Sequence, residues 1–377
     1  MVKKKVLVVG MLDSIHLARW LKQFVGTELN LLVFPSSYFR FPHPNLLELQ
    51  NSTIHIGGAT FFKSFLGYID SLVTFRFFGN RFGQYMRQLY LELLVAIYRP
   101  DIIHAIEIQH AGYLVSSIKG GSNRRILTNW GSDIYYFQHI AGHQAKIRKA
   151  LNWATHYSAE CERDYQLARE YDFVGGFLPK IPNAGGFEIL ELSRAKKHDL
   201  RQLIVKCYGG KFGLGSIAID VIDTFLLKDR KACVFLYSVT EDLLTSVKIL
   251  VEKYPNRVNY STISRPLSHE KLLLEFAKSR VYLGMSKSDG LSTSFLESLV
   301  MGVYPIQTDT SCANELLDNG AIGTVVPPNY QQVIQVLLKV FSDEKVLSEA
   351  KEVNRIIALK YLDFEKIKEK AKTFYEL

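Results

Sequence analysis

The sequence predicts an α/β fold made of two doubly wound parallel-sheet domains. The chain has 377 residues, which is long for one hydrophobic core and suits two domains. In each half, short runs rich in Val, Ile and Leu alternate with stretches of helical periodicity. That alternation is typical of a parallel sheet with helices on both faces. Between the halves, residues 177–186 are rich in Pro and Gly and indicate a boundary.

The first domain is expected to cover residues 1–185. A β-branched run ends at Gly10, and a helical pattern follows from Ser14 to Phe24. Later strand candidates are each followed by a helix or a loop, as in a parallel sheet. The expected strands of this domain are residues 5–9, 30–34, 101–104 and 125–128.

The second domain is expected to cover residues 200–360, after a charged segment at 191–199 that is either a linker or a surface helix. A C-terminal helix at 361–377 is able to pack back on the first domain. Two such domains facing one another across a cleft place ligands at the carboxyl ends of strands. The expected strands of the second domain are residues 203–205, 233–236, 258–260, 281–283, 304–306 and 323–326.

Composition predicts a folded, cytoplasmic protein. Hydrophobic residues make up 47% of the chain and charged residues 22%. No run of about 18 apolar residues is present, and the apolar run near the N-terminus is too short for a signal peptide. The cysteines are widely spaced and form no C-x-x-C motif, which favours reduced thiols and argues against a structural zinc. They are Cys161, Cys207, Cys233 and Cys312.

The net charge of +9 is concentrated in the first half of the chain. Residues 1–185 hold 20 Lys and Arg against 13 Asp and Glu, whereas residues 186–377 hold 26 against 24. This bias suggests an anionic partner for the first half. From Phe61 to Tyr98 there are eleven Phe or Tyr among basic residues. That segment either contacts an anionic membrane surface peripherally or packs inside the first domain.

One segment, residues 286–309, predicts an anion-binding loop followed by a helix. Small residues follow a strand that ends near residue 285, so free backbone N–H groups gather at the helix start. Glu297 is expected about two turns into this helix, where a carboxylate accepts bonds from a ribose diol. A nucleoside diphosphate carrying a sugar satisfies both features; the alternative is a capped helix with an incidental Glu. The expected contacts to the donor are Gly290, Leu291, Ser292, Thr293 and Glu297.

These residues resemble the donor-site motif of retaining glycosyltransferases of family 4, which have the GT-B fold. In that motif two Glu are separated by seven residues, and a Gly-x-x-Pro turn follows. Glu297 matches the second Glu, which holds the ribose, and Gly302 to Pro305 match the turn. Asp289 replaces the first Glu, which faces the transferred sugar in the family. The resemblance implies a UDP- or GDP-sugar as donor substrate, with no cofactor and no metal.

Two lysines follow the first strand of the second domain. In the family, an Arg and a Lys at this point hold the diphosphate, and Lys206 and Lys211 have similar spacing. Gly209 and Gly210 allow close backbone approach. Leu214 stands where a subgroup of the family places Arg. The alternative is that both lysines are solvated loop residues.

The first loop of the first domain, residues 10–16, leaves a strand and enters a helix. Asp13 or Ser14 is expected as the helix N-cap. The loop has one glycine and no G-x-G-x-x-G, so a dinucleotide fingerprint is not supported. Residues 13–20 resemble the opening of family members, in which this loop lies beside the acceptor. Ser14 and His16 are therefore acceptor-side candidates, with capping and surface packing as the alternative.

Two later segments of the first domain also resemble the family. His104, Glu107 and His110 lie at the end of a predicted strand, where they either contact the substrate or are structural. Trp130 stands where many members have a His that contacts the donor sugar, as in a subgroup reading Trp-Gly-Ser-Asp. Asp133 is the ionisable group of that motif. It is either catalytic or the cap of a helix that begins at residue 134.

Taken together, these residues and the family resemblance predict a metal-independent glycosyltransferase of hexosyltransferase type in bacterial polysaccharide or lipopolysaccharide biosynthesis. Retention of anomeric configuration is what the resemblance implies. The acceptor is expected to be a saccharide or a lipid-linked hydroxyl. The residues expected to act in catalysis are Asp289, Lys211 and Asp133, with Ser14, His16 and His110 on the acceptor side. Two alternatives stay open: a nucleotide-sugar epimerase on the same fold, and a non-catalytic binding subunit. Nucleic-acid binding is disfavoured because the basic residues lack a recognised motif.

Overall fold

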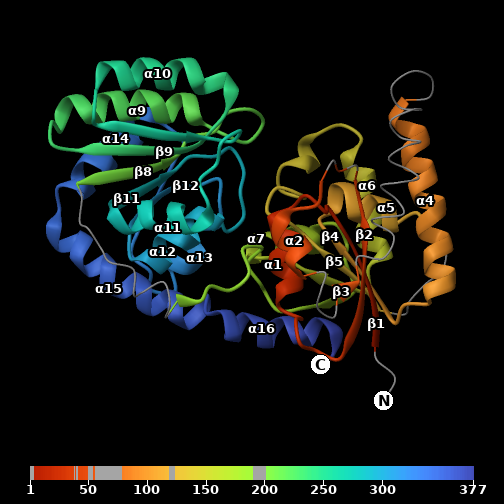
Figure 1. Ribbon diagram of the computed structural model, residues 1–377. Coiled ribbons are helices and arrows are strands. Elements are labelled where there is room, and N and C mark those ends of the chain that lie inside the picture. Colours follow the sequence, from red (N-terminus) through yellow and green to blue (C-terminus); the bar gives the residue numbers. More distant parts are fainter. Residues whose placement is uncertain are drawn as a thin grey trace. The chain divides into compact units, whose positions relative to one another are not determined.

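The computed structural model divides the chain into two compact units (Figure 1). The first unit comprises residues 1–185 together with 367–377, and the second comprises residues 186–366. The structure describes residues 4–37, 39, 41–49, 54–55, 79–118, 124–189 and 201–377. The charged segment at 191–199 and residues 61–78 of the aromatic segment at 61–98 therefore lie outside the described residues.

The first unit contains a seven-stranded parallel sheet in the order β3-β2-β1-β4-β5-β6-β7. The four strands expected from the sequence are present, and β3, β6 and β7 were not predicted. These three have only two or three residues each. The strands are β1 (Lys4–Gly10), β2 (Leu29–Pro35), β3 (Ile54–His55), β4 (Ile102–Ile106), β5 (Arg124–Thr128), β6 (His156–Ser158) and β7 (Gly176–Phe177).

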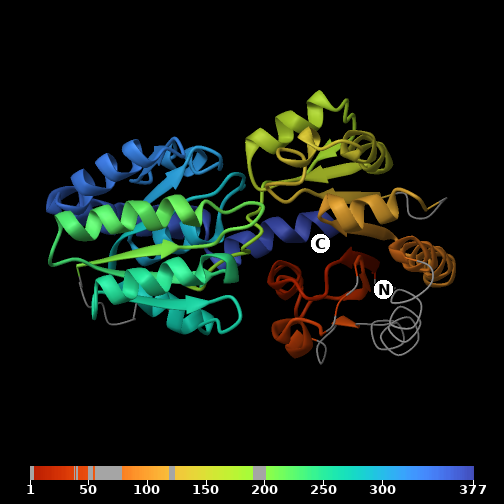
Figure 2. The same cartoon turned by 90° about the horizontal axis from the view of Figure 1, so that it is seen from above.

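Helices cover both faces of this sheet. Helices α1 (Ile15–Lys22) and α2 (Pro44–Leu49) bury Leu17, Leu21 and Leu46 against one face. The end of α16 (Phe364–Lys372) and the residues after it complete that layer. On the other face lie α4 (Gly79–Tyr98), α5 (Tyr113–Val115) and α6 (His143–Trp153). A further helix, α7 (Glu162–Glu170), follows β6. Figures 1 and 2 both show α4 at the rim of the first unit.

The second unit contains a six-stranded parallel sheet in the order β10-β9-β8-β11-β12-β13. All six strands expected from the sequence are present. Their alternating apolar residues fill a core on one face of the sheet. The strands are β8 (Gln202–Lys206), β9 (Cys233–Val239), β10 (Val258–Thr262), β11 (Ser279–Gly284), β12 (Tyr304–Thr308) and β13 (Thr324–Val326).

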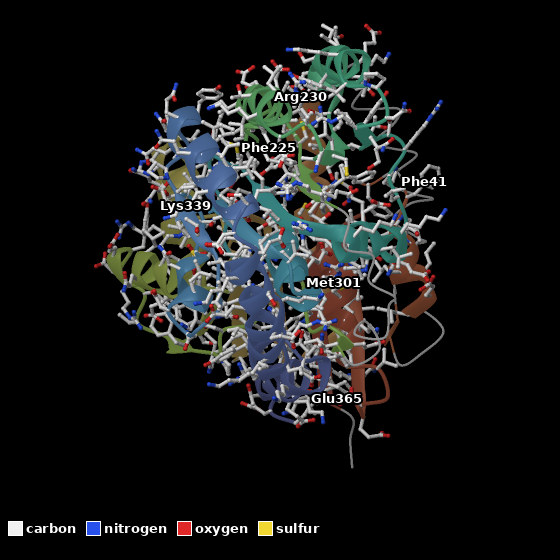
Figure 3. All side chains as sticks on the ribbon, turned by 90° about the vertical axis from the view of Figure 1, so that its left-hand side faces the viewer. Phe41, Phe225, Arg230, Met301, Lys339 and Glu365 are labelled. Carbon is white, nitrogen blue, oxygen red and sulfur yellow. The ribbon has the colours of Figure 1, made fainter. Side chains whose placement is uncertain are left out.

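Two helix layers enclose the second sheet. Helices α9 (Gly215–Lys228), α10 (Leu244–Lys253) and α14 (Tyr330–Phe341) cover one face (Figure 1). Helices α11 (His269–Lys278), α12 (Thr293–Met301), α13 (Asn314–Leu317) and α15 (Glu344–Tyr361) lie on the other side. Figure 3 labels residues of three of these helices: Phe225 on α9 and Met301 on α12 are buried, whereas Lys339 on α14 is exposed.

Each sheet has a point at which the winding of the chain reverses. That point lies between β1 and β4 in the first unit and between β8 and β11 in the second. Loops at the carboxyl ends of such neighbouring strands diverge to opposite faces, which opens a crevice for ligands. The topology thus predicts ligand contacts from the loops after β1 and β4 in the first unit and after β8 and β11 in the second. Among the helices that the structure places, none has the length and hydropathy needed to cross a membrane.

Candidate functional site

In the second unit, the loops after β8 and β11 are joined by backbone contacts. Gly213 and Ser286 form an antiparallel bridge, and the Lys287 N–H donates to the Phe212 carbonyl at 2.7 Å. Because paired backbone groups fix both loops in one register, the lysine-bearing loop and the loop with Asp289 are held side by side.

Two glycines shape the loop after β8. A Cβ on Gly213 would lie 1.9 Å from the Tyr208 carbonyl oxygen, so this position admits no side chain. Gly210 has a φ of +66°, a conformation that L side chains rarely adopt. A Cβ on Gly210 would meet no atom within 4 Å, so the space above this glycine is open. The approach of a phosphate to Gly209 and Gly210 stays a prediction.

The start of α12 leaves backbone donors for a ligand. Its N-cap, Ser292, makes no side-chain cap hydrogen bond. The Asp289 carboxylate instead accepts the Gly290 N–H at 2.9 Å, and the Asp289 N–H donates to the Thr310 carbonyl at 3.1 Å. Leu291 and Ser292 are buried. An anion at this helix end would consequently meet backbone N–H groups and the positive end of the helix dipole.

The two lysines differ in exposure. Lys206 is half-buried at the end of β8, with Nζ 4.9 Å from the centre of the Tyr208 ring. Lys211 is exposed in the loop, with Nζ 5.5 Å from the centre of the Phe212 ring. The position at which a subgroup of the family has Arg holds Leu214, the N-cap residue of α9. Two cationic side chains thus lie at the end of β8 and in the loop that follows it, beside the winding reversal of the second sheet.

Glu297 lies one helical turn from the start of α12, not two. The helix begins at Thr293, so Glu297 is its fifth residue, whereas the sequence estimate counted from the small residues of the loop. Its side chain is 3% exposed, and Oε1 lies 2.7 Å from Nε2 of His269 on α11. Sequence reasoning missed His269, because the pair joins two helices across 28 residues and no local motif marks it.

In the first unit, Ser14 and His16 lie at the start of α1. Ser14 is the N-cap: its Oγ accepts the His16 N–H at 3.2 Å. Nδ1 of His16 lies 3.1 Å from the Asn183 carbonyl oxygen, and its ring packs edge-on against Trp130 at 5.3 Å. His16, Trp130 and Gln23 are among the residues that line a small cavity. The buried Oε1 of Gln23 has no hydrogen-bond partner among the residues that the structure describes.

Glu107 holds the loop after β4 in a strained conformation. Its φ of 75° with ψ of 151° is unusual for any residue other than Gly. The buried carboxylate accepts the backbone N–H groups of His110 and Ala111 at 2.9 and 2.6 Å, and one oxygen lies 3.3 Å from His110 Nδ1. Hydrogen bonding to Glu107 raises the pKa of His110. His110 is thereby presented half-exposed beside a carboxylate.

Asp133 connects the loops that follow β4 and β5. One oxygen accepts the N–H groups of Ile108 and Trp130, both at 2.8 Å. Burial and the charge of Glu107 raise the pKa of Asp133. The expectation of a helix from residue 134 was wrong: residues 131–136 form turns, because Asp133 bonds a neighbouring loop and does not cap a helix. The buried carboxylate of Asp133 thus fixes the loops after β4 and β5 relative to one another.

His104 is fully buried and has both ring nitrogens engaged. Nδ1 lies 2.9 Å from the Tyr375 hydroxyl, and Nε2 lies 2.7 Å from Thr128 Oγ1. Of the two readings that the sequence left open for this histidine, the structure supports the structural one. It joins the middle of the sheet to the C-terminal residues, whose Tyr375 hydroxyl also accepts the Trp20 Nε1–H at 3.0 Å.

Comparisons with known proteins agree with this fold. Residues 79–157 match the family described as glycosyl transferase 4-like. Anabaena HepE in complex with UDP is similar over 99% of this chain and 100% of its own, with 15% identity and a TM-score of 0.69. Sucrose-phosphate synthase from Thermosynechococcus elongatus is similar over 99% and 98%, with 12% identity and a TM-score of 0.71. No curated protein matches the chain in sequence.

A third similar structure is that of a different kind of enzyme. A putative UDP-N-acetylglucosamine 2-epimerase from Listeria monocytogenes is similar over 99% of this chain and 97% of its own, with 10% identity and a TM-score of 0.65. Two doubly wound parallel-sheet units, with this similarity over the whole chain, define the fold as GT-B, as the sequence predicted. Fold alone does not select among the chemistries that it hosts.

Proposed function

We propose that this protein is a glycosyltransferase that moves a sugar from a nucleoside diphosphate sugar to a hydroxyl of a saccharide or lipid-linked acceptor. The observation that carries the proposal is Glu297, a buried carboxylate one turn inside α12, whose N-cap makes no side-chain hydrogen bond. A diphosphate on that helix end and a ribose diol on the carboxylate fit one ligand. UDP and UDP-glucose are bound in structures of HepE, which has the same fold.

In the proposed reaction, the sugar leaves the diphosphate while negative charge builds on the β-phosphate. Lys211, Lys206 and the N–H groups from Leu291 to Thr293 would stabilise that charge, because the Gly290 N–H already donates to the Asp289 carboxylate. Asp289 would face the sugar. The leaving phosphate would take the acceptor proton, with retention of anomeric configuration. Bond formation to the acceptor oxygen then balances cleavage of the bond between sugar and phosphate.

The first unit would bind the acceptor. Ser14, His16 and His110 lie on the loops at its winding reversal and are the proposed acceptor-side residues. One carboxylate oxygen of Asp133 already accepts two backbone N–H groups. Asp133 would therefore contribute to the reaction by positioning the loops that it joins. Hexosyl transfer in the synthesis of a bacterial polysaccharide or lipopolysaccharide is the finer form of the proposal.

Product analysis tests the proposal directly. The protein is incubated with UDP-glucose, and separately with GDP-mannose, with and without an extract of saccharide and lipid-linked acceptors. Transfer gives nucleoside diphosphate and a glycosylated acceptor by mass spectrometry. If the protein neither binds nor turns over any nucleotide sugar, the proposal is contradicted.

Nucleotide-sugar epimerisation is the second candidate, favoured by one observation. Glu107 and His110 form a carboxylate–histidine pair in which His110 is half-exposed and has a raised pKa. Such a pair suits proton transfer. An epimerase would convert the donor to its epimer without any acceptor, so the same product analysis separates the two chemistries.

Activity should survive chelation. The lysines and the start of α12 would neutralise the leaving diphosphate, and the sequence has no Asp-x-Asp motif for a metal. With EDTA in excess over divalent cations, the transfer rate should stay within about twofold of the untreated rate, because no step is expected to need a Lewis acid. Loss of turnover on chelation, with recovery on adding Mg²⁺ or Mn²⁺, would contradict this account.

The first unit should bind anionic membranes. Four apolar side chains at intervals of four residues form an exposed stripe on α4: Tyr85, Leu89, Leu93 and Ile97, which are 57%, 41%, 55% and 72% exposed. Each Lys or Arg near acidic lipid contributes about 1 kcal/mol, an attraction that salt weakens. Co-sedimentation with liposomes should therefore rise with acidic lipid content and fall at high salt.

Two sets of variants test this membrane contact. Changing Arg76, Arg81 and Arg87 to Glu should release the protein from liposomes and leave nucleotide binding intact; Arg76 and the side chain of Arg81 lie outside the described residues. Ile97→Gln should also weaken binding, whereas Ile249→Gln, on exposed Ile249 of α10, should not. If the unaltered protein ignores acidic liposomes at low salt, the membrane proposal fails.

A further inference from the structure

The His269–Glu297 pair joins two helices beside the proposed donor site. His269 is the first residue of α11, after the N-cap Ser268, and Glu297 lies on α12. The histidine side chain is 47% exposed and the glutamate side chain 3% exposed. Nε2 of His269 and Oε1 of Glu297 are 2.7 Å apart, the distance of a strong hydrogen bond. A group at the surface thus holds one oxygen of a buried carboxylate.

The two oxygens of Glu297 are not equivalent. Oε1 faces His269, whereas no side chain or N–H group that the structure places donates to Oε2. The terminal torsion of a Glu side chain is broad, so its own rotamer preference does not aim the carboxylate. A donor on Oε1 fixes the plane of the group and leaves Oε2 as an oriented acceptor.

We propose that His269 is a positioning residue for nucleotide recognition: it orients Glu297 so that Oε2 accepts the hydroxyls of the ribose diol. The inference rests on the proposed function, because it assigns the ribose to Glu297. It adds a residue on α11 to a site otherwise built from the loops after β8 and β11 and from α12. In this arrangement His269 does not contact the nucleotide and acts through Glu297.

A purely structural role for His269 makes a different prediction. A histidine that only compensates a buried carboxylate would stabilise the fold, and its loss would affect every ligand of this unit equally. A positioning histidine affects only ligands that carry the diol. Comparing UDP with 2′,3′-dideoxy-UDP, which lacks both ribose hydroxyls, separates the two roles.

The experiment is titration calorimetry of the full chain with these two nucleotides. His269→Ala should weaken UDP binding about five- to tenfold, the effect of losing one oriented charge-assisted bond. His269→Gln places an amide N–H close to the position of Nε2 and should bring UDP affinity back to within about twofold of the unaltered protein. For 2′,3′-dideoxy-UDP, all three proteins should have the same affinity. His139→Ala, at an exposed histidine of the first unit, is the matched control and should change nothing.

Each contrary result has its own meaning. Equal losses for UDP and its dideoxy analogue in His269→Ala would overturn the inference, as would a failure of His269→Gln to recover UDP affinity. UDP binding that depends on the diol but ignores His269 would remove the inference alone and leave the proposed function standing. If the unaltered protein binds neither UDP nor GDP, the proposed function fails and the inference fails with it.

Discussion

Glu297→Gln should weaken the binding of UDP or GDP about tenfold or more. The change keeps the shape of the side chain and removes its charge. A hydrogen bond to a charged group contributes roughly 1.5–3 kcal/mol more than no bond, and 1.4 kcal/mol corresponds to a factor of ten. Calorimetric titration of the unaltered and variant proteins measures the loss directly.

The matched control for this variant is Glu252→Gln, which makes the same chemical change at an exposed position on α10. It should leave the nucleotide dissociation constant unchanged. Because Glu297 is buried, thermal unfolding must show that its variant keeps the fold. A folded Glu297→Gln protein with an unchanged dissociation constant would show that the nucleotide binds elsewhere.

The strands of the second unit could be predicted because their signal is local. Most are short apolar runs that are buried in the sheet, and four of the six have a neighbouring strand on both edges. The missed strands of the first unit carry little such signal. β3 and β7 have two residues each, and β6 is His-Tyr-Ser. They are strands because a neighbouring strand offers backbone partners, a tertiary effect that periodicity does not report.

The candidate site divides in the same way. A strand, a glycine-rich loop and a helix start are contiguous in sequence, so the loops around Lys211 and Asp289 could be found from it. The pairing of His269 with Glu297 and the positive φ of Glu107 depend on how distant elements pack. Asp133 shows the same limit: its partner Ile108 is 25 residues away, and that contact replaced the expected helix cap.

Acid should destabilise the first unit through His104. Burial, and secondarily the charge of Arg124, lower the pKa of His104 from 6.5 to about 3 in the folded protein. Between these two values the unfolded chain binds a proton that the folded unit excludes. The free energy of unfolding is therefore unaffected by His104 above about pH 6.5 and falls as the pH drops below it. At pH 4.5 the loss should be roughly 2–3 kcal/mol, at about 1.4 kcal/mol per pH unit.

Tryptophan fluorescence isolates this effect, because all three tryptophans (Trp20, Trp130 and Trp153) lie in the first unit. Urea unfolding followed by fluorescence at pH 7 and at pH 4.5 gives the loss for the unaltered protein. His104→Gln should be less stable than the unaltered protein at pH 7, because it loses the hydrogen bonds to Tyr375 and Thr128. Because glutamine cannot take up a proton, the variant should lose roughly 2–3 kcal/mol less stability on acidification. His139→Gln should follow the unaltered protein at both values. If His104→Gln and the unaltered protein lose equal stability between pH 7 and 4.5, the buried histidine is not the acid-sensitive group.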